Sequence, residues 1–269
     1  MVDATHAQVW GNTATYEAYM GRWSRPVAKA ALDWLGVPPG LTWLDVGCGT
    51  GALTEVILEA ADPSEILGVD PSADFLATSA AQIADPRVRF AIGDASALPV
   101  PDDAYDVVIA GLVLHFVPDP LPAIREMMRA ARRGGTVAAY VWDFAGERQF
   151  TRYLWQAATV LDPAASAQDP NRQCAVCHSE PLAALFGEAG LQTVTVDAVV
   201  VPTVFRNFAD YWQPHLPGGS SPAQRYVASL DDGQRTALRE RLHAMLPIAN
   251  DGSILLLGHV WAVRGTKSA

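Results

Sequence analysis

A short glycine-rich segment at residues 44–51, Leu-Asp-Val-Gly-Cys-Gly-Thr-Gly, constrains this chain more than any other feature. It ends an apolar run at residues 41–46 and precedes an apolar run with helical spacing at residues 52–60. Glycines directly after a buried strand let the backbone turn tightly and approach a ligand closely. The N–H groups at the start of the next helix then point toward that ligand. The segment therefore predicts a strand, a ligand-binding loop and a helix in succession.

The same alternation of short apolar strands and amphipathic helices extends on both sides of this segment. We expect helices at residues 24–36, 52–60, 72–84 and 121–131, and strands at residues 41–46, 66–69, 88–92, 105–110 and 136–142. Strands that alternate with helices are typical of parallel crossovers, which place helices on both faces of one sheet. The pattern predicts a doubly wound α/β domain.

Beyond residue 143 strands and helices no longer alternate regularly. We expect helices at residues 147–161 and 181–189, a strand at 193–201, a mostly helical insertion at 202–250 and a last strand at 253–263. The last strand is apolar on both faces, which predicts a position inside the sheet. Because it follows a strand and a helical insertion, we expect it to enter antiparallel between existing strands.

Length, composition and charge exclude several classes of protein. The chain has 269 residues, of which 50% are hydrophobic, so it can bury a sizeable core and is not expected to be disordered. Its formal net charge of −10 counts against a nucleic-acid partner. The first ten residues lack a secretory signal, and the longest apolar run, residues 107–117, is shorter than the roughly 20 residues of a membrane helix. We therefore expect a cytoplasmic protein with no membrane partner, either a monomer or a homodimer.

An aspartate stands at the carboxyl end of each of the first three expected strands. Asp45 lies two residues before the first glycine of the loop, where a carboxylate would repel a pyrophosphate but suits a cationic amino or sulfonium group. Asp70 ends the second strand, where it can accept two ribose hydroxyls, and Asp94 follows the third, where it can accept from an adenine amino group. Open α/β sheets bind ligands at this edge. For Asp94 alone, capping of a turn is the alternative.

A nicotinamide-dependent oxidoreductase is the alternative that the glycine loop leaves open. Gly47, Gly49 and Ala52 satisfy the G-x-G-x-x-A form of the dinucleotide fingerprint. The carboxylate two residues before the loop disfavours this class. The chain also has no Tyr-x-x-x-Lys pair, because its only lysines are Lys29 and Lys267.

Four motifs follow one another along roughly residues 40–145. They are residues 44–51, Gly-Val-Asp-Pro-Ser at 68–72, Gly-Asp-Ala at 93–95, and Tyr-Asp-Val-Val at 105–108 leading to Leu-His-Phe-Val-Pro-Asp-Pro at 114–120. In this order they resemble the class I S-adenosylmethionine-dependent methyltransferases, in the small-molecule branch that includes the ubiquinone and menaquinone biosynthesis type. One departure is Phe116, where a second histidine is frequent in the family.

The resemblance implies a fold and a reaction. The fold would be a Rossmann-like seven-stranded sheet with an antiparallel last strand and a helical lid. The reaction would transfer a methyl group from S-adenosylmethionine to a small-molecule acceptor, with S-adenosylhomocysteine as the product. A protein that binds S-adenosylmethionine without catalysis is a further alternative.

The resemblance also implies which residues contact the cofactor. The glycine loop would contact its methionine part, Asp70 the ribose and Asp94 the adenine, and backbone near Leu112 would lie beside the sulfonium. Arg22 lies in a lead-in segment that resembles the family's, and its guanidinium suits the methionine carboxylate. Packing of that segment as a helix is the alternative. The full expected set is Tyr19, Arg22, Asp45, Gly47, Cys48, Gly49, Gly51, Asp70, Pro71, Gly93, Asp94, Ala95 and Leu112.

On this interpretation the chain divides into four parts. Residues 1–40 would form helices that cover the cofactor, residues 41–201 the core that binds S-adenosylmethionine, residues 202–250 a helical lid, and residues 251–269 the final core strand and tail. Aromatic residues of the lid suit either an apolar acceptor pocket or helix packing. They are Phe205, Phe208, Tyr211, Trp212 and Tyr226.

Methyl transfer is a direct displacement at the methyl carbon, so the protein must mainly align the acceptor atom and exclude water. A general base is needed only when the acceptor must lose a proton. His115 follows the fourth strand and Asp143 the fifth, and a histidine oriented by a carboxylate is a suitable base. The alternatives are a packed histidine and a helix cap. Tyr16, His178 and His215 are lesser candidates for this role.

The segment Cys174-Ala-Val-Cys177-His178 matches the C-x-x-C-H signature of c-type haem attachment. Haem attachment belongs to exported proteins, and a zinc site would need ligands that no second Cys or His pair supplies. We therefore expect neither haem nor metal, and interpret the segment as a loop before the helix at residue 181.

Overall fold

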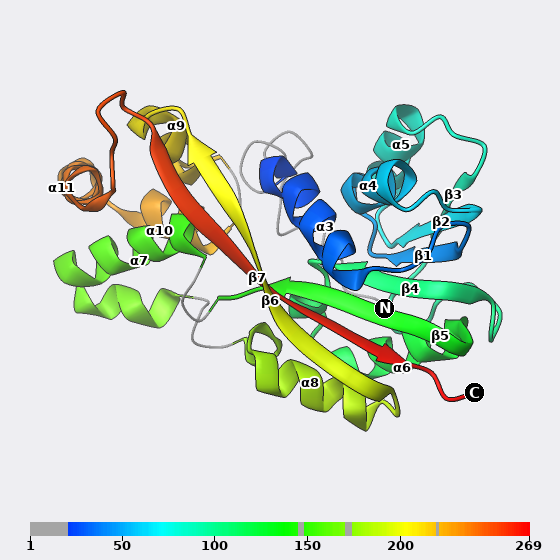
Figure 1. The fold of residues 1–269 in the computed structure, drawn as a ribbon. Helices are drawn as coiled ribbons and strands as arrows, with labels where there is room; N and C mark the ends of the chain where they lie inside the picture. The colour runs from blue at the N-terminus through cyan, green and yellow to red at the C-terminus, as the bar shows by residue number, and fades with distance from the viewer. Residues whose placement is uncertain (1–20, 145–147, 170–173, 219–220) are drawn as a thin grey trace. The chain divides into compact units, whose positions relative to one another are not determined.

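The computed structural model describes residues 21–144, 148–169, 174–218 and 221–269. One mixed sheet runs in the order β3-β2-β1-β4-β5-β7-β6 (Figure 1). Neighbouring strands from β3 to β5 are parallel, and β7 is antiparallel to β5, which confirms the expected sheet. The strands are β1 (Thr42–Val46), β2 (Glu65–Asp70), β3 (Val88–Ile92), β4 (Tyr105–Gly111), β5 (Ala131–Trp142), β6 (Gln192–Phe205) and β7 (Ile254–Thr266).

The chain forms two compact units. The sheet unit comprises Ser24–Trp142, Ala175–Val199 and Val260–Ala269. The helical unit comprises Asp143–Cys174, Val200–His259 and the residues up to Trp23. β6 and β7 each have one half in the sheet unit and the other half in the helical unit. The division of the chain at residues 40, 201 and 250 stays a prediction.

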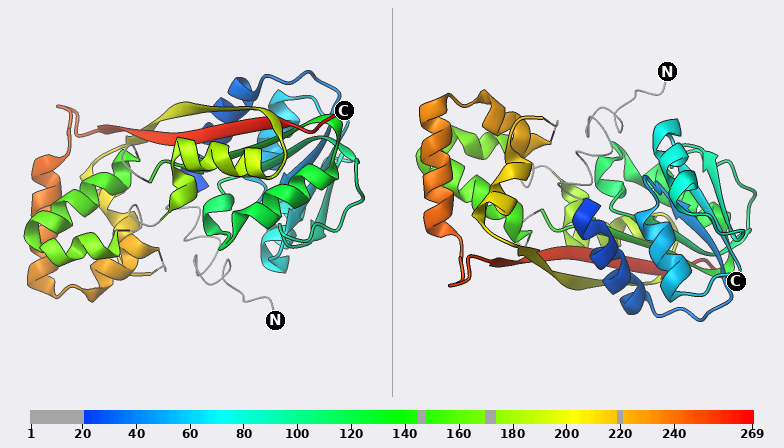
Figure 2. Two further views of the ribbon diagram at one scale, coloured as in Figure 1. Left: turned by 90° about the horizontal axis from the view of Figure 1, so that it is seen from below. Right: turned by 90° about the horizontal axis from the view of Figure 1, so that it is seen from above.

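Helices cover both faces of the sheet in the sheet unit (Figures 1 and 2). One face carries α3 (Arg22–Leu35), α4 (Ala52–Ala60) and α5 (Ala73–Gln82), and the other carries α6 (Pro120–Ala130) and α8 (Ser179–Glu188). A parallel sheet covered on both faces needs strands that are apolar throughout. The central strands meet this need with fully buried side chains, among them Trp43, Leu44, Val107, Val108 and Val137.

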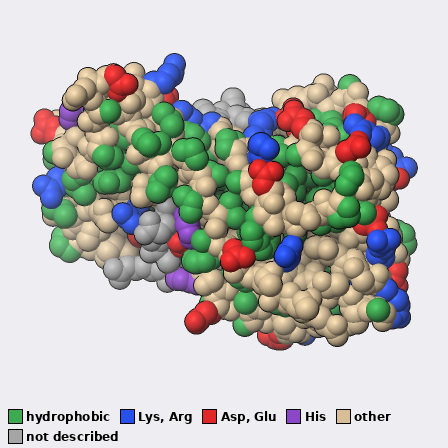
Figure 3. All heavy atoms as spheres, in the orientation of Figure 1, with side chains coloured by type: hydrophobic (Ala, Val, Ile, Leu, Met, Phe, Trp, Pro, Cys, Tyr) green, Lys and Arg blue, Asp and Glu red, His purple; other side chains and the backbone are tan. Residues whose placement is uncertain are grey.

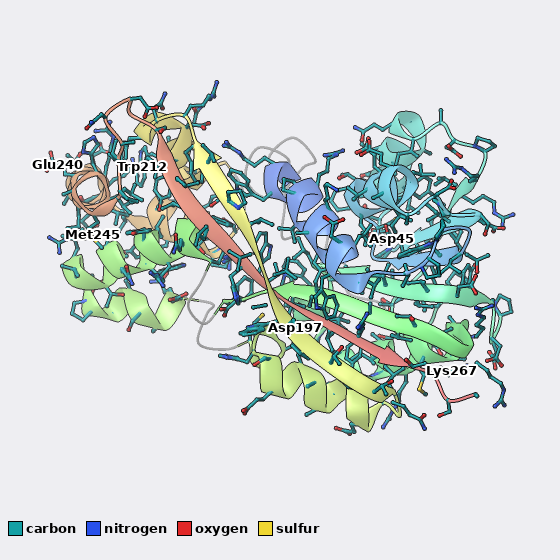
Figure 4. All side chains as sticks on the ribbon, in the orientation of Figure 1. Asp45, Asp197, Trp212, Glu240, Met245 and Lys267 are labelled. Atoms are coloured by element: carbon teal, nitrogen blue, oxygen red, sulfur yellow. The ribbon has the colours of Figure 1, made fainter. Side chains whose placement is uncertain are left out.

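α3 packs through an apolar stripe and is fixed to the last two strands by polar contacts. Val27, Ala31 and Leu35 recur at intervals of four residues and are buried. The indole N–H of Trp34 donates to Asp197 of β6 at 2.9 Å, and Asp197 is labelled in Figure 4. The guanidinium of Arg264 in β7 donates to the carbonyl oxygen of Leu35 at 2.8 Å.

β5 is longer than the strand expected at residues 136–142, because it begins at Ala131 and includes Gly134 and Gly135. The C-terminal backbone explains the difference. Gly134 donates its N–H to the carbonyl of Lys267 at 3.0 Å, and Lys267 donates to the carbonyl of Gly135 at 3.0 Å. These two bonds continue the strand pairing past the glycines, with Gly134 at a φ of 72°.

The helical unit consists of short helices around α7. Its helices are α7 (Gln149–Leu161), α9 (Phe208–Trp212), α10 (Pro222–Ser229) and α11 (Asp232–Met245), with 3₁₀ turns at η3 (Pro163–Gln168) and η6 (Gln213–His215). α7 packs against α10, α11 and η3. Figure 4 labels Trp212 on α9, and Glu240 and Met245 on α11. Ser221 and Asp231 begin α10 and α11 with capping boxes, which satisfy the first N–H groups of each helix.

The aromatic residues expected in the lid form the core of the helical unit. Phe205 packs on Tyr211 with ring centroids 5.2 Å apart, and Tyr226 packs on Trp155 at 5.4 Å. All five residues of that set are no more than 8% exposed. The structure thus shows them in helix packing, the second of the two interpretations that the sequence allowed.

The halves of β6 and β7 in the helical unit alternate buried and exposed side chains, as strands with one covered face do. Apolar side chains therefore gather on their outer face in Figure 3, where Val200, Val204, Leu255 and Leu257 are exposed. In the part of the chain that the structure describes, no helix has both the length and the apolar character needed to cross a membrane.

Candidate functional site

The glycine loop after β1 has a backbone that requires glycine. Gly47, Gly49 and Gly51 have φ angles of 71°, 54° and 86°, in the left-handed region that side chains with a Cβ rarely adopt. A Cβ on Gly47 would meet the side chain of Val113 at 2.5 Å. A Cβ on Gly49 would meet nothing within 4 Å. The loop thus packs on the protein at Gly47 and leaves space at Gly49, where a ligand can approach the backbone.

Hydrogen bonds fix this loop to the ends of β2 and α5. The N–H groups of Gly47 and Cys48 donate to the carbonyl of Val69 at 2.7 and 3.1 Å. The N–H of Gly49 donates to Oδ2 of Asp70 at 2.9 Å, and the hydroxyl of Ser79 donates to the carbonyl of Gly49 at 2.8 Å. The loop is therefore a rigid cradle.

Asp70 ends β2 and is 4% exposed. Its Oδ1 accepts the N–H of Ser72 at 2.9 Å, and its Oδ2 accepts that of Gly49. These two backbone bonds orient the carboxylate of Asp70. The expected contact of Asp70 with a ribose stays a prediction. Pro71, the next residue of the expected set, is exposed.

Asp45 is 1% exposed and lies in β1 facing α4, where Figure 4 labels it. The hydroxyl of Thr54 donates to its Oδ2 at 2.6 Å, whereas its buried Oδ1 has no hydrogen-bond partner among the described residues. Burial raises the pKa of Asp45 to about 7, and the negative charge of Asp70 adds to the rise, while the Thr54 bond opposes it. A cation beside Oδ1 would favour the ionised carboxylate. The site therefore fits a positively charged group of the ligand.

Asp94 follows β3 and is half-buried. Its Oδ1 accepts the N–H of Ser96 at 2.8 Å, so the turn-capping interpretation of this residue is correct for that oxygen. Gly93 donates its N–H to the carbonyl of Asp70 at 3.2 Å, and a Cβ there would clash with Pro99 at 2.5 Å. This close packing brings the segment 93–95 to the end of β2.

The three aspartates lie at one edge of the sheet. β1, β2 and β3 are adjacent parallel strands, with Val46 paired to Val69 and Asp70 paired to Ile92. Their carboxyl ends therefore coincide, as the sequence predicts. The assignment of each aspartate to a part of a ligand stays a prediction.

The end of β4 carries a strained residue. Leu112 has a φ of 61°, although it is not glycine, and its N–H donates to the carbonyl of Tyr140 at 2.8 Å. Such backbone strain costs about 1–3 kcal/mol and concentrates at functional sites. It lies at the same edge of the sheet as the aspartates, where the sequence predicts contact with a ligand.

His115 lies three residues farther on, in the 3₁₀ turn η2 (Leu114–Phe116), and is half-buried. Its ring packs on that of Phe116, with centroids 4.1 Å apart. The position at the end of β4 agrees with the sequence analysis. Its role as a base stays a prediction.

Asp143 directly follows β5 and contacts a histidine that the sequence analysis did not consider. Its Oδ2 lies 3.2 Å from Nδ1 of His259 in β7, and its N–H donates to the carbonyl of His259 at 2.9 Å. Both side chains are nearly buried, at 7% and 12% exposed. Asp143 does not cap α7, whose N-cap is Arg148. The signal in the sequence was a lone histidine in an apolar strand, but finding its partner required the antiparallel register.

Arg22 has a carboxylate partner inside the helical unit. Its guanidinium donates to Oδ1 and Oδ2 of Asp210 at 3.3 and 3.2 Å, and it lies 4.5 Å from the ring centroid of Trp23. Burial acts to raise the pKa of Asp210, but hydrogen bonds from Arg22 and Arg206 hold it at about 2. The pairing of Arg22 with a ligand carboxylate stays a prediction. Tyr19 and Tyr16 lie outside the described residues.

His215 is unsuited to act as a base. It is 2% exposed, and its ring packs on Tyr211 with centroids 5.2 Å apart. Burial lowers its pKa to about 3, and the positive charge of Arg148 adds to the effect. An imidazole with so low a pKa has little tendency to accept a proton near neutral pH. His178, the other minor candidate, is exposed at the start of α8.

The cysteines fall into two kinds. Cys174 and Cys177 are disulfide-bonded, so neither sulfur is the thiolate that binds a metal. Cys48 in the glycine loop is free and buried. Burial raises the pKa of its thiol above the usual range, and the charges of Asp45 and Asp70 add to this. Cys48 is therefore a neutral thiol that contributes packing and its backbone N–H.

Comparisons with known proteins agree with this geometry. A family model described as a methyltransferase domain matches residues 44–139. A demethylmenaquinone methyltransferase from Lysinibacillus sphaericus is 32% identical over 176 residues, which are 61% of this chain and 75% of the relative. One from Roseiflexus castenholzii is 33% identical over 174 residues, 60% of this chain and 72% of the relative.

Solved structures share the fold at low sequence identity. A putative methyltransferase from Bacillus halodurans has a TM-score of 0.57 and 15% identity, covering 90% of this chain and 99% of that one. A phosphoethanolamine N-methyltransferase 2 from Haemonchus contortus in complex with S-adenosyl-L-methionine has a TM-score of 0.54 and 17% identity, covering 90% of this chain and 52% of that one.

Proposed function

The chain belongs to the class I S-adenosylmethionine-dependent methyltransferases, and from this premise we propose that its methyl acceptor is a hydroxylated naphthalene ring of the demethylmenaquinol type. The enzyme transfers a methyl group from S-adenosylmethionine to a small molecule. The observation that carries the proposed acceptor is the pair of relatives named demethylmenaquinone methyltransferase, of which this chain covers 75% and 72% at 32–33% identity.

The residues at the edge of the sheet fit S-adenosylmethionine, which supplies a methyl group on a positively charged sulfur. Under this proposal Asp45, with its unpartnered Oδ1, faces the cationic end of the cofactor. Gly49 gives close access to the loop backbone, and Asp70 accepts the ribose hydroxyls. Asp94 is assigned to the adenine amino group, with Leu112 beside the sulfonium. Each of these groups is held by bonds that precede ligand binding, so little reorganisation is needed.

A hydroxylated ring must lose a proton as it is methylated, so this acceptor requires a base. His115 and Asp143 are the residues that the sequence proposes for this step. Asp143 also contacts His259 of β7, with its Oδ2 3.2 Å from Nδ1 of the imidazole.

The proposal is tested by incubating the purified enzyme with S-adenosylmethionine and demethylmenaquinol, kept reduced by dithionite. We expect equal amounts of S-adenosylhomocysteine and of a quinol that has gained one methyl group in place of hydrogen, identified by mass spectrometry. Calorimetry with S-adenosylmethionine, and with NAD as the comparison, verifies binding independently. Tight binding of S-adenosylmethionine without methylation of the quinol would refute the acceptor but not the cofactor. Location in the cytoplasm, and a monomer or homodimer, are proposed as well, and light scattering checks the second.

A further inference from the structure

Ser79 of α5 is a buried polar residue to which neither the sequence analysis nor the proposed function gives a role. It is 0% exposed and lies on the side of α5 that packs against the glycine loop. A Cβ added at Gly51 would lie 3.4 Å from Cβ of Ser79 and 2.7 Å from Cδ1 of Ile83. Burying a hydroxyl costs free energy unless it forms hydrogen bonds, so the partners of Ser79 indicate what it does.

The hydroxyl of Ser79 holds the carbonyl of Gly49. It donates to the carbonyl oxygen of Gly49 at 2.8 Å and lies 3.0 Å from that of Phe75, one turn earlier in α5. A serine has one proton to donate. The carbonyl of Phe75 lies inside the helix, where backbone N–H groups serve as donors, so the bond to Gly49 is the one that links α5 to another segment.

Asp70 holds the N–H of the same glycine. The N–H of Gly49 donates to Oδ2 of Asp70 at 2.9 Å, and Oδ1 of Asp70 accepts the N–H of Ser72 at 2.9 Å. Ser72 begins α5, and its hydroxyl oxygen accepts the N–H of Phe75 at 3.3 Å. Asp70, Ser72, Phe75, Ser79 and Gly49 thus form a closed ring of hydrogen bonds, which lies entirely within the sheet unit.

The ring fixes the residue at which the glycine loop is most open. Gly49 has a φ of 54°, and a Cβ added there would meet nothing within 4 Å. Glycine has more backbone freedom than any other residue, and packing around a Cβ does not restrain this position. The bonds at its N–H and its carbonyl are therefore what keep the N–H directed at Asp70.

Resting on the assignment of Gly49 and Asp70 to the cofactor under the proposed function, we infer that Ser79 is a positioning residue for S-adenosylmethionine. It acts through Gly49. Because the carbonyl of Gly49 is held, its N–H stays on Asp70 and orients that carboxylate, and the loop backbone is fixed before the cofactor binds. A site that is organised in advance binds more tightly, so loss of the Ser79 hydroxyl should weaken cofactor binding although no assigned contact is changed.

Calorimetry with S-adenosylmethionine tests this by comparing Ser79→Ala with the matched control Thr78→Ala. The Thr78 hydroxyl also donates to the carbonyl four residues earlier, that of Asp74 at 3.0 Å, but this bond stays within α5. We expect the Kd to rise about 10-fold in Ser79→Ala, since one hydrogen bond is lost, and to stay within about twofold in Thr78→Ala. A Kd of Ser79→Ala within twofold of wild type would overturn the inference.

Ser79→Thr separates positioning from a general loss of stability. This variant keeps the hydroxyl but adds a methyl group at a fully buried position, so its Tm should be lower than that of the wild type. Its Kd should nevertheless stay within about twofold of wild type, because the bond to Gly49 remains. Weaker binding by Ser79→Thr than by Ser79→Ala would show that affinity follows packing, and the inference would be wrong.

Amide hydrogen exchange of the cofactor-free protein reports on Gly49 directly. We expect the N–H of Gly49 to exchange about 10-fold faster in Ser79→Ala than in the wild type, and at the wild-type rate in Thr78→Ala. Equal exchange in Ser79→Ala and the wild type would overturn the inference even if the Kd changed. None of these measurements uses a methyl acceptor, so failure to methylate demethylmenaquinol would refute the proposed acceptor alone.

Discussion

Two aspartates, the buried Asp45 in the sheet unit and the partly buried Asp210 in the helical unit, have opposite electrostatic environments. Asp210 in the helical unit accepts hydrogen bonds from Arg22 and Arg206, and its pKa is held at about 2. Asp45 in the sheet unit has one hydroxyl donor and an unpartnered oxygen, and burial raises its pKa to about 7. The charge of Asp210 is compensated within the protein. That of Asp45 is not, because its buried Oδ1 has no hydrogen-bond partner among the described residues.

The largest expected difference between Asp45 and Asp210 lies in how each makes the free energy of unfolding depend on pH. In the unfolded chain the pKa of Asp45 returns to 3.8, while in the folded protein it is about 7. Between these values the unfolded state has lost a proton that the folded state retains, so the free energy of unfolding falls as pH rises and levels off above about 7. The shift corresponds to about 4 kcal/mol.

Urea denaturation at several pH values, without cofactor, checks this prediction. Asp45→Asn cannot ionise, so its stability should fall less over the same range than that of the wild type. Parallel curves for the two proteins would show that Asp45 ionises normally in the folded state. The comparison of the two aspartates would then be wrong.

The second expected difference between Asp45 and Asp210 is their effect on the affinity for S-adenosylmethionine. Asp45→Asn removes the carboxylate that we assign to the cationic end of S-adenosylmethionine. A hydrogen bond to a charged group contributes about 1.5–3 kcal/mol, so the Kd should rise by about 10- to 100-fold. Isothermal titration calorimetry measures this directly, at a pH above 7. An unchanged Kd would remove Asp45 from the cofactor site.

Asp210→Asn should lower the free energy of unfolding without weakening cofactor binding. The lowered pKa of Asp210 contributes stability that is present above pH 3.8 and lost as pH falls through about 2. Its loss should lower the free energy of unfolding at neutral pH by about 2 kcal/mol and leave the Kd for S-adenosylmethionine unchanged. Tighter binding would instead show that Arg22, once released, pairs with the methionine carboxylate, as the sequence proposes.

The smallest expected effect comes from alanine substitutions at two glycines, one in each unit. Gly49 in the loop and Gly252 in the helical unit have φ angles of 54° and 86°, and a Cβ on either would meet nothing within 4 Å. Alanine at each position should therefore destabilise the fold by about 1 kcal/mol through backbone strain alone. Only Gly49→Ala should also weaken cofactor binding, because its methyl group would enter the space assigned to the ligand. Thermal unfolding and calorimetry of both variants provide the test, and equal affinities would refute the assignment.

Much of the sheet unit could be predicted from the sequence. The order of apolar strands and helices determines parallel crossovers, and the carboxyl ends of adjacent parallel strands meet at one edge. Asp45, Asp70 and Asp94 are therefore brought together by local pattern alone. The glycine loop is equally local, since its φ angles are possible for few residues other than glycine.

Contacts between distant segments could not be predicted in this way. From the sequence we expected Asp143 to pair with His115 after β4, but the antiparallel register of β7 places His259 against Asp143. Arg22 and Asp210 both lie in the helical unit but are separated by 188 residues, so local pattern does not reveal their pairing. The extension of β5 through Gly134 and Gly135 likewise depends on pairing with the C-terminal backbone.

The glycine segment that constrains the fold also identified the family, because strand, loop and helix there are fixed by neighbours in the chain. The sequence alone thus determined the sheet and the class of reaction, and it predicts the edge at which the cofactor binds. Only the tertiary structure decided the charge state of Asp45 and the partners of Asp143 and Arg22. The physical reason is that burial and pairing depend on atoms supplied by other segments of the folded chain, which local pattern does not encode.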